Sequence, residues 1–370
     1  ADQILVVVRS GSSPVELEPV AELVDHAPPF TERLLVCLGR GRAPAGTAAL
    51  VDAAQCHSAV HMDESKPREP VRIARIVTGI ARGLVLSGGG ARGFAHLGVY
   101  RALEEMGVEV DIFGGSSIGT PLAAGMADGY PPDELEALVS RLFANVLDYT
   151  VPVAAFTAGR GITAASEEAF GDRDIEDLRL PFFGVSTNLT EADVHIHRRG
   201  SVVHAIRASC AVPGFMPPVP HNGDLLVDGG ITNNLPIDVM RELTPHGEIV
   251  AVDVAPGKGP VAREEFGLWV SGVKLLRERI RGRRSAPPIS MTLMRALTVG
   301  SGRRHKEMSL WSLSDRILEL DIEATPMFAF DRVEEIARRG YEQALPEIEA
   351  WLDAGERNDE GERRVAADAS

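Results

Sequence analysis

Two glycine-rich turns hold the residues with the clearest capacity for chemistry. The first, residues 87–93, reads Ser-Gly-Gly-Gly-Ala-Arg-Gly and follows the apolar run Leu-Val-Leu at 84–86. Apolar residues then recur at helical spacing as far as Gly107, so the turn is predicted to join a buried parallel strand to a helix. Glycines let other atoms approach the backbone closely, and N–H groups at the start of a helix attract negative charge. The turn therefore favours a site for an anion or an oxyanion.

This first turn has three interpretations. Gly88, Gly90 and Gly93 match the G-x-G-x-x-G pattern of dinucleotide-binding proteins, and Asp111 lies near the distance expected for a ribose-binding acid. That acid should end a strand, whereas Asp111 precedes an apolar pair. The other interpretations are an oxyanion hole, in which backbone N–H groups stabilise a tetrahedral intermediate, and a tight turn without chemistry. A P-loop is disfavoured because no Gly-Lys-Ser/Thr sequence ends the turn.

The second turn contains a candidate nucleophile. Residues 115–119 read Gly-Ser-Ser-Ile-Gly and fit G-x-S-x-G, with a short apolar strand before them and a helical pattern after them. In this arrangement a sharp turn lifts the central serine out of the backbone at the edge of a sheet. We therefore favour a nucleophilic Ser117 over the alternative of a turn without chemistry. We expect Ser116 to be a packing residue or to position its neighbours.

A later aspartate is the candidate base. Residues 224–230 read Asp-Leu-Leu-Val-Asp-Gly-Gly, which predicts a strand that ends at Asp228. Asp-Gly is also a common turn dipeptide, so an ordinary turn is the alternative. An aspartate is a weak base, with a reference pKa of about 3.9. It can activate Ser117 only within direct hydrogen-bond reach and with some desolvation.

In this order, Gly-Gly-Gly-x-Arg-Gly, Gly-x-Ser-x-Gly and Asp-Gly-Gly resemble the motifs of the patatin-like phospholipase family. Within that family the chain resembles the neuropathy target esterase branch. Three further stretches support the branch: residues 75–79 (Arg-Ile-Val-Thr-Gly), residues 206–218 with Ile-Arg-Ala-Ser and Pro-Gly-Phe-Met-Pro-Pro, and residues 228–236 with Asp-Gly-Gly-Ile-Thr-Asn-Asn-Leu-Pro. The similarity covers most of residues 1–350.

The resemblance implies an α/β fold, a patatin-like three-layer sandwich whose central, mostly parallel sheet is flanked by helices. It implies lysophospholipase or carboxylesterase activity on a lipid ester, with no metal and no organic cofactor. The catalytic pair would be a Ser117–Asp228 dyad without histidine. The implied oxyanion hole comprises Gly88, Gly89 and Gly90, with Arg92 supporting the loop.

Rival mechanisms and classes remain open at this point. A Ser–Asp–His triad in chain order would need a histidine beyond the aspartate, and only His246 and His305 qualify. His96, beside the first turn, is expected to pack or cap. A nucleotide-binding oxidoreductase built on Gly88-x-Gly90-x-x-Gly93 should bind NAD, but leaves the serine and aspartate motifs unexplained. The presence of all three motifs argues against a catalytically silent regulator.

Composition limits the classes further. At 370 residues and 44% hydrophobic content, the chain has room for one large α/β domain and an extension. The net charge of −15 argues against nucleic acid and against adsorption of the whole surface to anionic lipid. We expect no transmembrane helix and no signal peptide, because no run of 18 apolar residues and no charged start are present. Three scattered cysteines suit a reducing, cytoplasmic compartment.

The predicted organisation has four parts. Residues 1–66 alternate strands and helices, and we expect a small α/β unit that extends the main sheet. Residues 67–82 are a linker and a helix, residues 83–352 the catalytic domain, and residues 353–370 a charged, disordered tail. Because Ala1 is not an initiator methionine, we expect missing upstream sequence. Members of this branch often carry cyclic-nucleotide-binding modules there, and none is present in these residues.

Four other segments have two interpretations each. Residues 151–170 are apolar and predict an acyl pocket or lid, or a buried connection, and the loop at 213–218 is a candidate part of the same pocket. His195 and His197 alternate on a strand, which we assign to an exposed edge rather than to a metal site without a third ligand. The segment from Lys274 to Arg284 is basic with interleaved apolar residues, and predicts either a solvated helix followed by a flexible basic loop or a basic amphipathic helix in peripheral contact with phospholipid headgroups.

Overall fold

The computed structural model describes residues 3–25, 28, 31–41, 45–144, 146–254, 269, 271–281, 292, 296, 299–300, 313–322 and 325–368. Two sheets organise this part of the chain, one with three strands and one with eight. No helix in these ranges has the length and apolar character needed to cross a bilayer.

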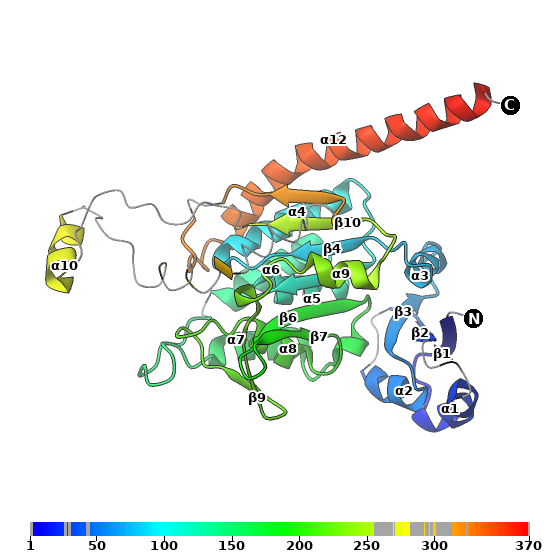
Figure 1. Cartoon of the computed structure of the whole chain (residues 1–370), viewed down its shortest axis with the longest axis horizontal. Coiled ribbons are helices and arrows are strands. Elements are labelled where there is room, and N and C mark those ends of the chain that lie inside the picture. Colours follow the sequence, from blue (N-terminus) through cyan, green and yellow to red (C-terminus); the bar gives the residue numbers. More distant parts are fainter. Residues whose placement is uncertain are drawn as a thin grey trace.

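The N-terminal unit has a sheet of its own, with three parallel strands in the order β1-β2-β3. It lies beside the main body and is joined to it through α3 (Figure 1). The prediction that these strands extend the main sheet is therefore wrong, because their edges pair only with one another in the described residues. Its elements are β1 (Gln3–Arg9), η1 (Pro14–Leu17), α1 (Glu18–Asp25), β2 (Glu32–Gly39), α2 (Thr47–Ala53), β3 (Ser58–Asp63) and α3 (Glu69–Val77).

The main sheet has the strand order β11-β10-β4-β5-β6-β9-β8, with β7 paired to the outer side of β6. Five neighbouring strands, β11 to β6, are parallel, and β7, β9 and β8 are antiparallel to their neighbours. The strands are β4 (Gly83–Leu86), β5 (Ile112–Ser116), β6 (Phe182–Asn188), β7 (Asp193–His197), β8 (Val219–His221), β9 (Asp224–Asp228), β10 (Ile249–Asp253) and β11 (Arg316–Glu319).

Helices cover both faces of this sheet, which confirms the predicted three-layer α/β architecture (Figure 1). Side-chain alternation along β4 shows why: Leu84 and Leu86 join the larger core under α4, α5, α6 and α12, whereas Val85 joins a smaller core with α9. The remaining elements are η2 (Gly90–Phe94), α4 (Ala95–Glu105), α5 (Gly119–Ala127), α6 (Pro132–Phe143), α7 (Arg160–Phe170), η3 (Ile175–Asp177), α8 (Val202–Ser209), η4 (Gly229–Ile231), α9 (Ile237–Leu243), α10 (Gly272–Ile280) and α12 (Val333–Asp368).

The helices α4 and α12 cross at two glycines. A Cβ added to Gly98 would lie 2.0 Å from the carbonyl oxygen of Ala337, and one added to Gly340 would lie 2.2 Å from that of Ala95. Real Cβ atoms do not approach backbone so closely, so only glycine permits this crossing. Because α4 begins directly after the first glycine-rich turn, this contact also holds the helix that follows the turn.

Two predictions about segments need correction. The tail predicted as disordered is helical as far as Asp368, because α12 continues through it. Residues 151–170 are not one buried connection: residues 151–154 are exposed, and the rest of the segment forms α7 from Arg160 onward. The mixture of small and apolar residues hid this change from surface loop to helix.

Candidate active site

Ser117 lies on a strained turn between β5 and α5. Its φ is 52°, in the left-handed region that non-glycine residues rarely adopt. The glycines on either side are required by space: a Cβ at Gly115 would lie 2.5 Å from the carbonyl carbon of Gly119, and one at Gly119 would lie 2.4 Å from the carbonyl oxygen of Leu86. The motif therefore folds as the sequence predicts, with the serine raised at the carboxyl end of a central parallel strand.

The sheet register brings Asp228 to this serine. Ser116 pairs with Val185 on β6, and Asp228, at the end of β9, pairs with the next residue along β6. The hydroxyl of Ser117 donates to Asp228 Oδ2 at 2.6 Å. The other carboxylate oxygen accepts the N–H of Gly230 at 2.8 Å. The structure thus places the two predicted residues in direct hydrogen-bond contact, from positions 111 residues apart in the chain.

Burial changes the acidity of this carboxyl group. Asp228 is only 4% exposed, and its burial raises the pKa of the carboxyl to about 6. The hydrogen bonds from Ser117 and Gly230 lower this pKa, but by less than burial raises it. The carboxylate is consequently a stronger base than an exposed aspartate, yet remains ionised at neutral pH. These are the two conditions under which an aspartate can take a proton from a serine.

The first glycine-rich turn lies against the same serine. A Cβ at Gly88 would be 2.9 Å from the Cβ of Ser117, and the N–H of Gly88 donates to the carbonyl of Asn234 at 3.1 Å. Gly90 has a φ of 60°. Among the described residues, no acceptor lies within hydrogen-bond reach of the N–H groups of Gly89 and Gly90. The turn therefore leaves Gly89 and Gly90, rather than Gly88, with amides available for an oxyanion.

Arg92 ties this turn to a segment far along the chain. Its Nε donates to the carbonyl of Thr325 at 3.1 Å, and the neighbouring N–H of Ala91 donates to the carbonyl of Met327 at 2.8 Å. The guanidinium thus links the turn to the backbone at Thr325, and its support of the oxyanion loop stays a prediction of the family resemblance.

Ser209 is a site residue whose role the sequence did not reveal. Its hydroxyl accepts the N–H of Ser117 at 2.9 Å, donates to the carbonyl of Val185 at 2.5 Å and lies 2.7 Å from the hydroxyl of Thr120. It therefore fixes the strained turn to β6. The only signal was its place in the Ile-Arg-Ala-Ser stretch at 206–209, which marked the family but not the contact.

Replacing Ser209 by alanine is expected to lower kcat about tenfold to a hundredfold with KM nearly unchanged, because the turn that orients Ser117 loses its anchor. Steady-state kinetics on a water-soluble ester measures this. Ser140→Ala is the matched control, because its buried hydroxyl has no hydrogen-bond partner among the described residues. Equal losses in both variants would mean that Ser209 does not position the nucleophile.

Of the two histidine candidates for a triad, the structure describes only His246, which is not near this pair. His246 precedes β10 and donates its N–H to the carbonyl of Gly79, at the amino edge of the parallel strands, whereas Ser117 follows the carboxyl edge. His305 is outside the described residues. His96 is buried in α4 with Nε2 at 2.9 Å from the carbonyl of Ser87, and burial lowers its pKa to about 4, so it packs as a neutral ring, as expected.

The dinucleotide interpretation does not fit this geometry. Asp111 is buried at the amino end of β5, where Arg72 and Arg75 bond to its carboxylate. A ribose-binding acid should instead lie at the carboxyl edge, beside the glycine-rich turn. Asp111 holds α3 against the main sheet, so it is not placed to recognise a ribose.

His195 and His197 lie on β7, which pairs only with β6 in the described part of the sheet, so the assignment to an edge strand is correct. His197 is nevertheless buried, with Nε2 at 2.8 Å from the hydroxyl of Ser186. His204 and His221 join them, with ring centroids 4.7 Å apart for His195 and His221. No set of His, Cys, Asp or Glu among the described residues is arranged to hold a metal ion.

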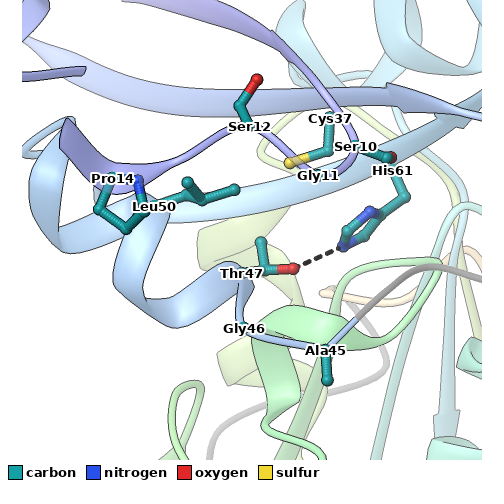
Figure 2. A pocket seen from close by; sticks show the side chains of 10 residues that line it. All are labelled: Ser10, Gly11, Ser12, Pro14, Cys37, Ala45, Gly46, Thr47, Leu50 and His61. Atoms are coloured by element: carbon teal, nitrogen blue, oxygen red, sulfur yellow. Dashed lines mark hydrogen bonds between the residues drawn. The ribbon is translucent and has the colours of Figure 1, made fainter. Parts of the chain in front are cut away.

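A separate cavity of about 70 Å³ lies in the N-terminal unit, at the carboxyl edge of its small sheet (Figure 2). Its titratable groups are neutral at physiological pH: burial raises the pKa of the Cys37 thiol to about 12 and lowers that of His61. His61 lies 3.5 Å from the hydroxyl of Thr47 and 2.9 Å from the carbonyl of Glu176. The imidazole is thus also bound to a backbone carbonyl, and no carboxylate among the described residues lines the cavity to orient it as a base, so Ser117 remains the candidate catalytic centre.

Comparison with known proteins identifies a family model and several relatives that are similar to this chain. The family model for patatin-like phospholipases matches residues 84–241, which span the first turn, Ser117 and Asp228. An uncharacterized NTE family protein of Mycobacterium tuberculosis is 38% identical over 294 residues, 76% of this chain and 48% of the relative. Patatin-like phospholipase domain-containing protein 7 of Mus musculus is 34% identical over 295 residues, 77% of this chain and 22% of the relative.

Among solved structures, the crystal structure of VipD from Legionella pneumophila aligns with a TM-score of 0.38 and 14% sequence identity, over 73% of this chain and 67% of that one. The chain spans about half the length of the mycobacterial relative, and less of the mouse protein.

Proposed function

The chain belongs to the patatin-like phospholipase family, with relatives among the NTE family proteins, and we propose that it is a serine esterase acting on lipid esters. Its substrates would be the acyl esters of lysophospholipids or phospholipids, with lysophospholipids as the first class to assay. The observation that carries the proposal is the 2.6 Å hydrogen bond from Ser117 to a buried aspartate whose pKa is about 6. The family match supports the lipid character of the ester.

In the proposed reaction, Asp228 takes the hydroxyl proton of Ser117 while Oγ forms a bond to the ester carbonyl carbon. The carbonyl π electrons move to oxygen, and the N–H groups of Gly89 and Gly90 stabilise that oxyanion. Collapse of the intermediate breaks the ester bond, and the alcohol leaves with the proton from Asp228. Water then attacks the acyl-serine, Asp228 accepts its proton, and Ser117 recovers that proton as the fatty acid departs.

The pH profile tests the role given to Asp228. Its ionised form is the base, so log kcat/KM for lysophosphatidylcholine is expected to rise with slope one below about pH 6 and to level off above it. The midpoint should hardly move with temperature, because a carboxyl group has a small ionisation enthalpy. A midpoint that falls clearly on warming would indicate an imidazole base instead, and a flat profile would exclude Asp228 as the base.

Membrane contact and compartment are part of the same proposal. α10 presents exposed Lys274 and Arg277 together with exposed Val273 and Ile280, and exposed Arg281 follows it, which supports peripheral contact with phospholipid headgroups. The last three residues of the predicted basic segment, 282–284, are outside the described residues. The three cysteines are unpaired, which supports a reducing compartment such as the cytoplasm.

A further inference from the structure

An apolar hairpin projects from the molecule ahead of α7 (Figure 1). The apolar hairpin is defined by residues 149–157: Tyr149 and Thr157 pair across it, and the N–H of Thr150 donates to the carbonyl of Phe156 at 2.9 Å. No residue in it is charged. Its large side chains are nonetheless in water, with exposed fractions of 72% for Tyr149, 77% for Val151, 92% for Val153 and 55% for Phe156.

Backbone contacts connect this hairpin to the active site. The N–H groups of Phe156 and Thr157 donate to the carbonyls of Gly214 and Phe215, at 3.0 and 2.9 Å. The ring of Phe215 stacks on that of Phe328 with centroids 4.4 Å apart. Phe328 follows Met327, whose carbonyl accepts the N–H of Ala91 in the first glycine-rich turn. A chain of backbone hydrogen bonds and one pair of stacked rings therefore links the hairpin to the turn beside Ser117.

We propose that the apolar hairpin inserts into the surface of a bilayer or micelle and so brings that surface to Ser117. The inference rests on the proposed function, in which the substrate is a lipid ester that resides in such a surface. Hydrogen bonds within the hairpin pair part of its backbone N–H and C=O groups. Its tip therefore presents mainly apolar side chains. Exposed valines and aromatic rings of this kind enter the boundary between headgroups and acyl chains.

The charges nearby suit a lipid surface. Arg160, three residues after the hairpin, has an 88% exposed side chain whose Nε lies 3.9 Å from the carboxylate of Asp148. α10, with its exposed cations, lies on the same side of the main sheet in Figure 1, and Trp269 just before it is 82% exposed. A surface with apolar tips and flanking cations complements anionic headgroups over an apolar interior, even though the chain as a whole carries a charge of −15.

Binding is tested in a Ser117→Ala background, so that the result does not depend on hydrolysis. The double variant Val151→Asp/Val153→Asp is expected to weaken partitioning to phosphatidylcholine vesicles by about tenfold or more, measured by co-sedimentation, because two exposed apolar side chains become charged. Val15→Asp/Val71→Asp is the matched control, with two exposed valines of the N-terminal unit changed in the same way. The control should bind as the parent does.

Activity separates this role from catalysis. With Ser117 intact, the hairpin variant should lose about tenfold in kcat/KM on vesicle or micellar substrate, but keep its rate on a water-soluble ester. Charge reversal of Lys274, Arg277 and Arg281 should instead weaken only salt-sensitive binding to vesicles that contain phosphatidylserine. The proposal would be overturned if the hairpin variant partitioned like the parent, or if the control lost as much binding. It would also be overturned if light scattering showed that the hairpin variant changes the oligomeric state, because a second copy of the chain would then be the partner of the hairpin.

Discussion

Ser117→Ala is expected to lower kcat/KM for ester hydrolysis by about 10⁴-fold or more, and Asp228→Asn by about 10³-fold or more. Without the hydroxyl no acyl-enzyme forms, and without the carboxylate the Ser117 proton has no acceptor in the described part of the site. Because the two residues act as a pair, the double variant should be no slower than Ser117→Ala alone. Hydrolysis of a medium-chain p-nitrophenyl ester and of lysophosphatidylcholine measures all three variants.

Stability distinguishes lost chemistry from lost folding in Asp228→Asn. The pKa of Asp228 is raised from 3.8 to about 6 in the folded protein, so folding favours its protonated form. The unfavourable burial of its charge therefore grows as pH rises from about 4 to 6 and is complete above that window. At pH 8 the free energy of unfolding of the asparagine variant should therefore equal that of the wild type or exceed it by up to about 3 kcal/mol. Its unfolding temperature should be the same or higher. An inactive but destabilised variant would leave the catalytic role unsupported.

Gly340→Ala is expected to destabilise the protein by about 2–4 kcal/mol, although alanine favours helix over glycine. The added Cβ would lie 2.2 Å from the carbonyl oxygen of Ala95, so α12 must move away from α4 and open the core between them. Thermal unfolding followed by circular dichroism measures the change. Activity should fall with the folded fraction, since α4 carries the first turn at its start.

The control for this substitution is Gly272→Ala in α10, where an added Cβ meets no atom within 4 Å. There the helix propensity of alanine acts alone, so the variant should be neutral or slightly more stable. Equal effects at the two positions would mean that the crossing of α4 and α12 tolerates a methyl group, contrary to the packing described.

The sequence was sufficient for features governed by local patterns. Apolar runs followed by glycine-rich turns located β4 to within a residue and the start of β5, because buried parallel strands and the turns after them have few alternatives in composition. The end of β5 lies three residues beyond the apolar pair at 112–113. The second of these turns also identified Ser117 as the candidate nucleophile. The glycines at 115 and 119 are required there, because a Cβ at either position would lie 2.4–2.5 Å from backbone atoms. Asp228 was found from its Asp-Gly-Gly turn together with the family resemblance.

Features that depend on long-range pairing were missed for a physical reason. Ser209 contacts Ser117 only because α8 packs on β6, and a lone serine in a helix gives no sign of that contact. The amide of Gly88 is taken by Asn234, 146 residues away, which no local pattern reveals. The separate N-terminal sheet was misjudged because β-α-β-α-β alternation specifies parallel strands, but not which sheet they join.

Covalent labelling with a long-chain alkyl fluorophosphonate, followed by intact mass and peptide mapping, tests the nucleophile directly. A Ser117–Asp228 dyad should give one adduct per chain, on the peptide that contains Ser117. The labelling rate should fall as pH drops through about 6 and be strongly reduced in Asp228→Asn. An adduct on another residue, or equally fast labelling of Ser117→Ala, would contradict the assignment of Ser117 as the nucleophile.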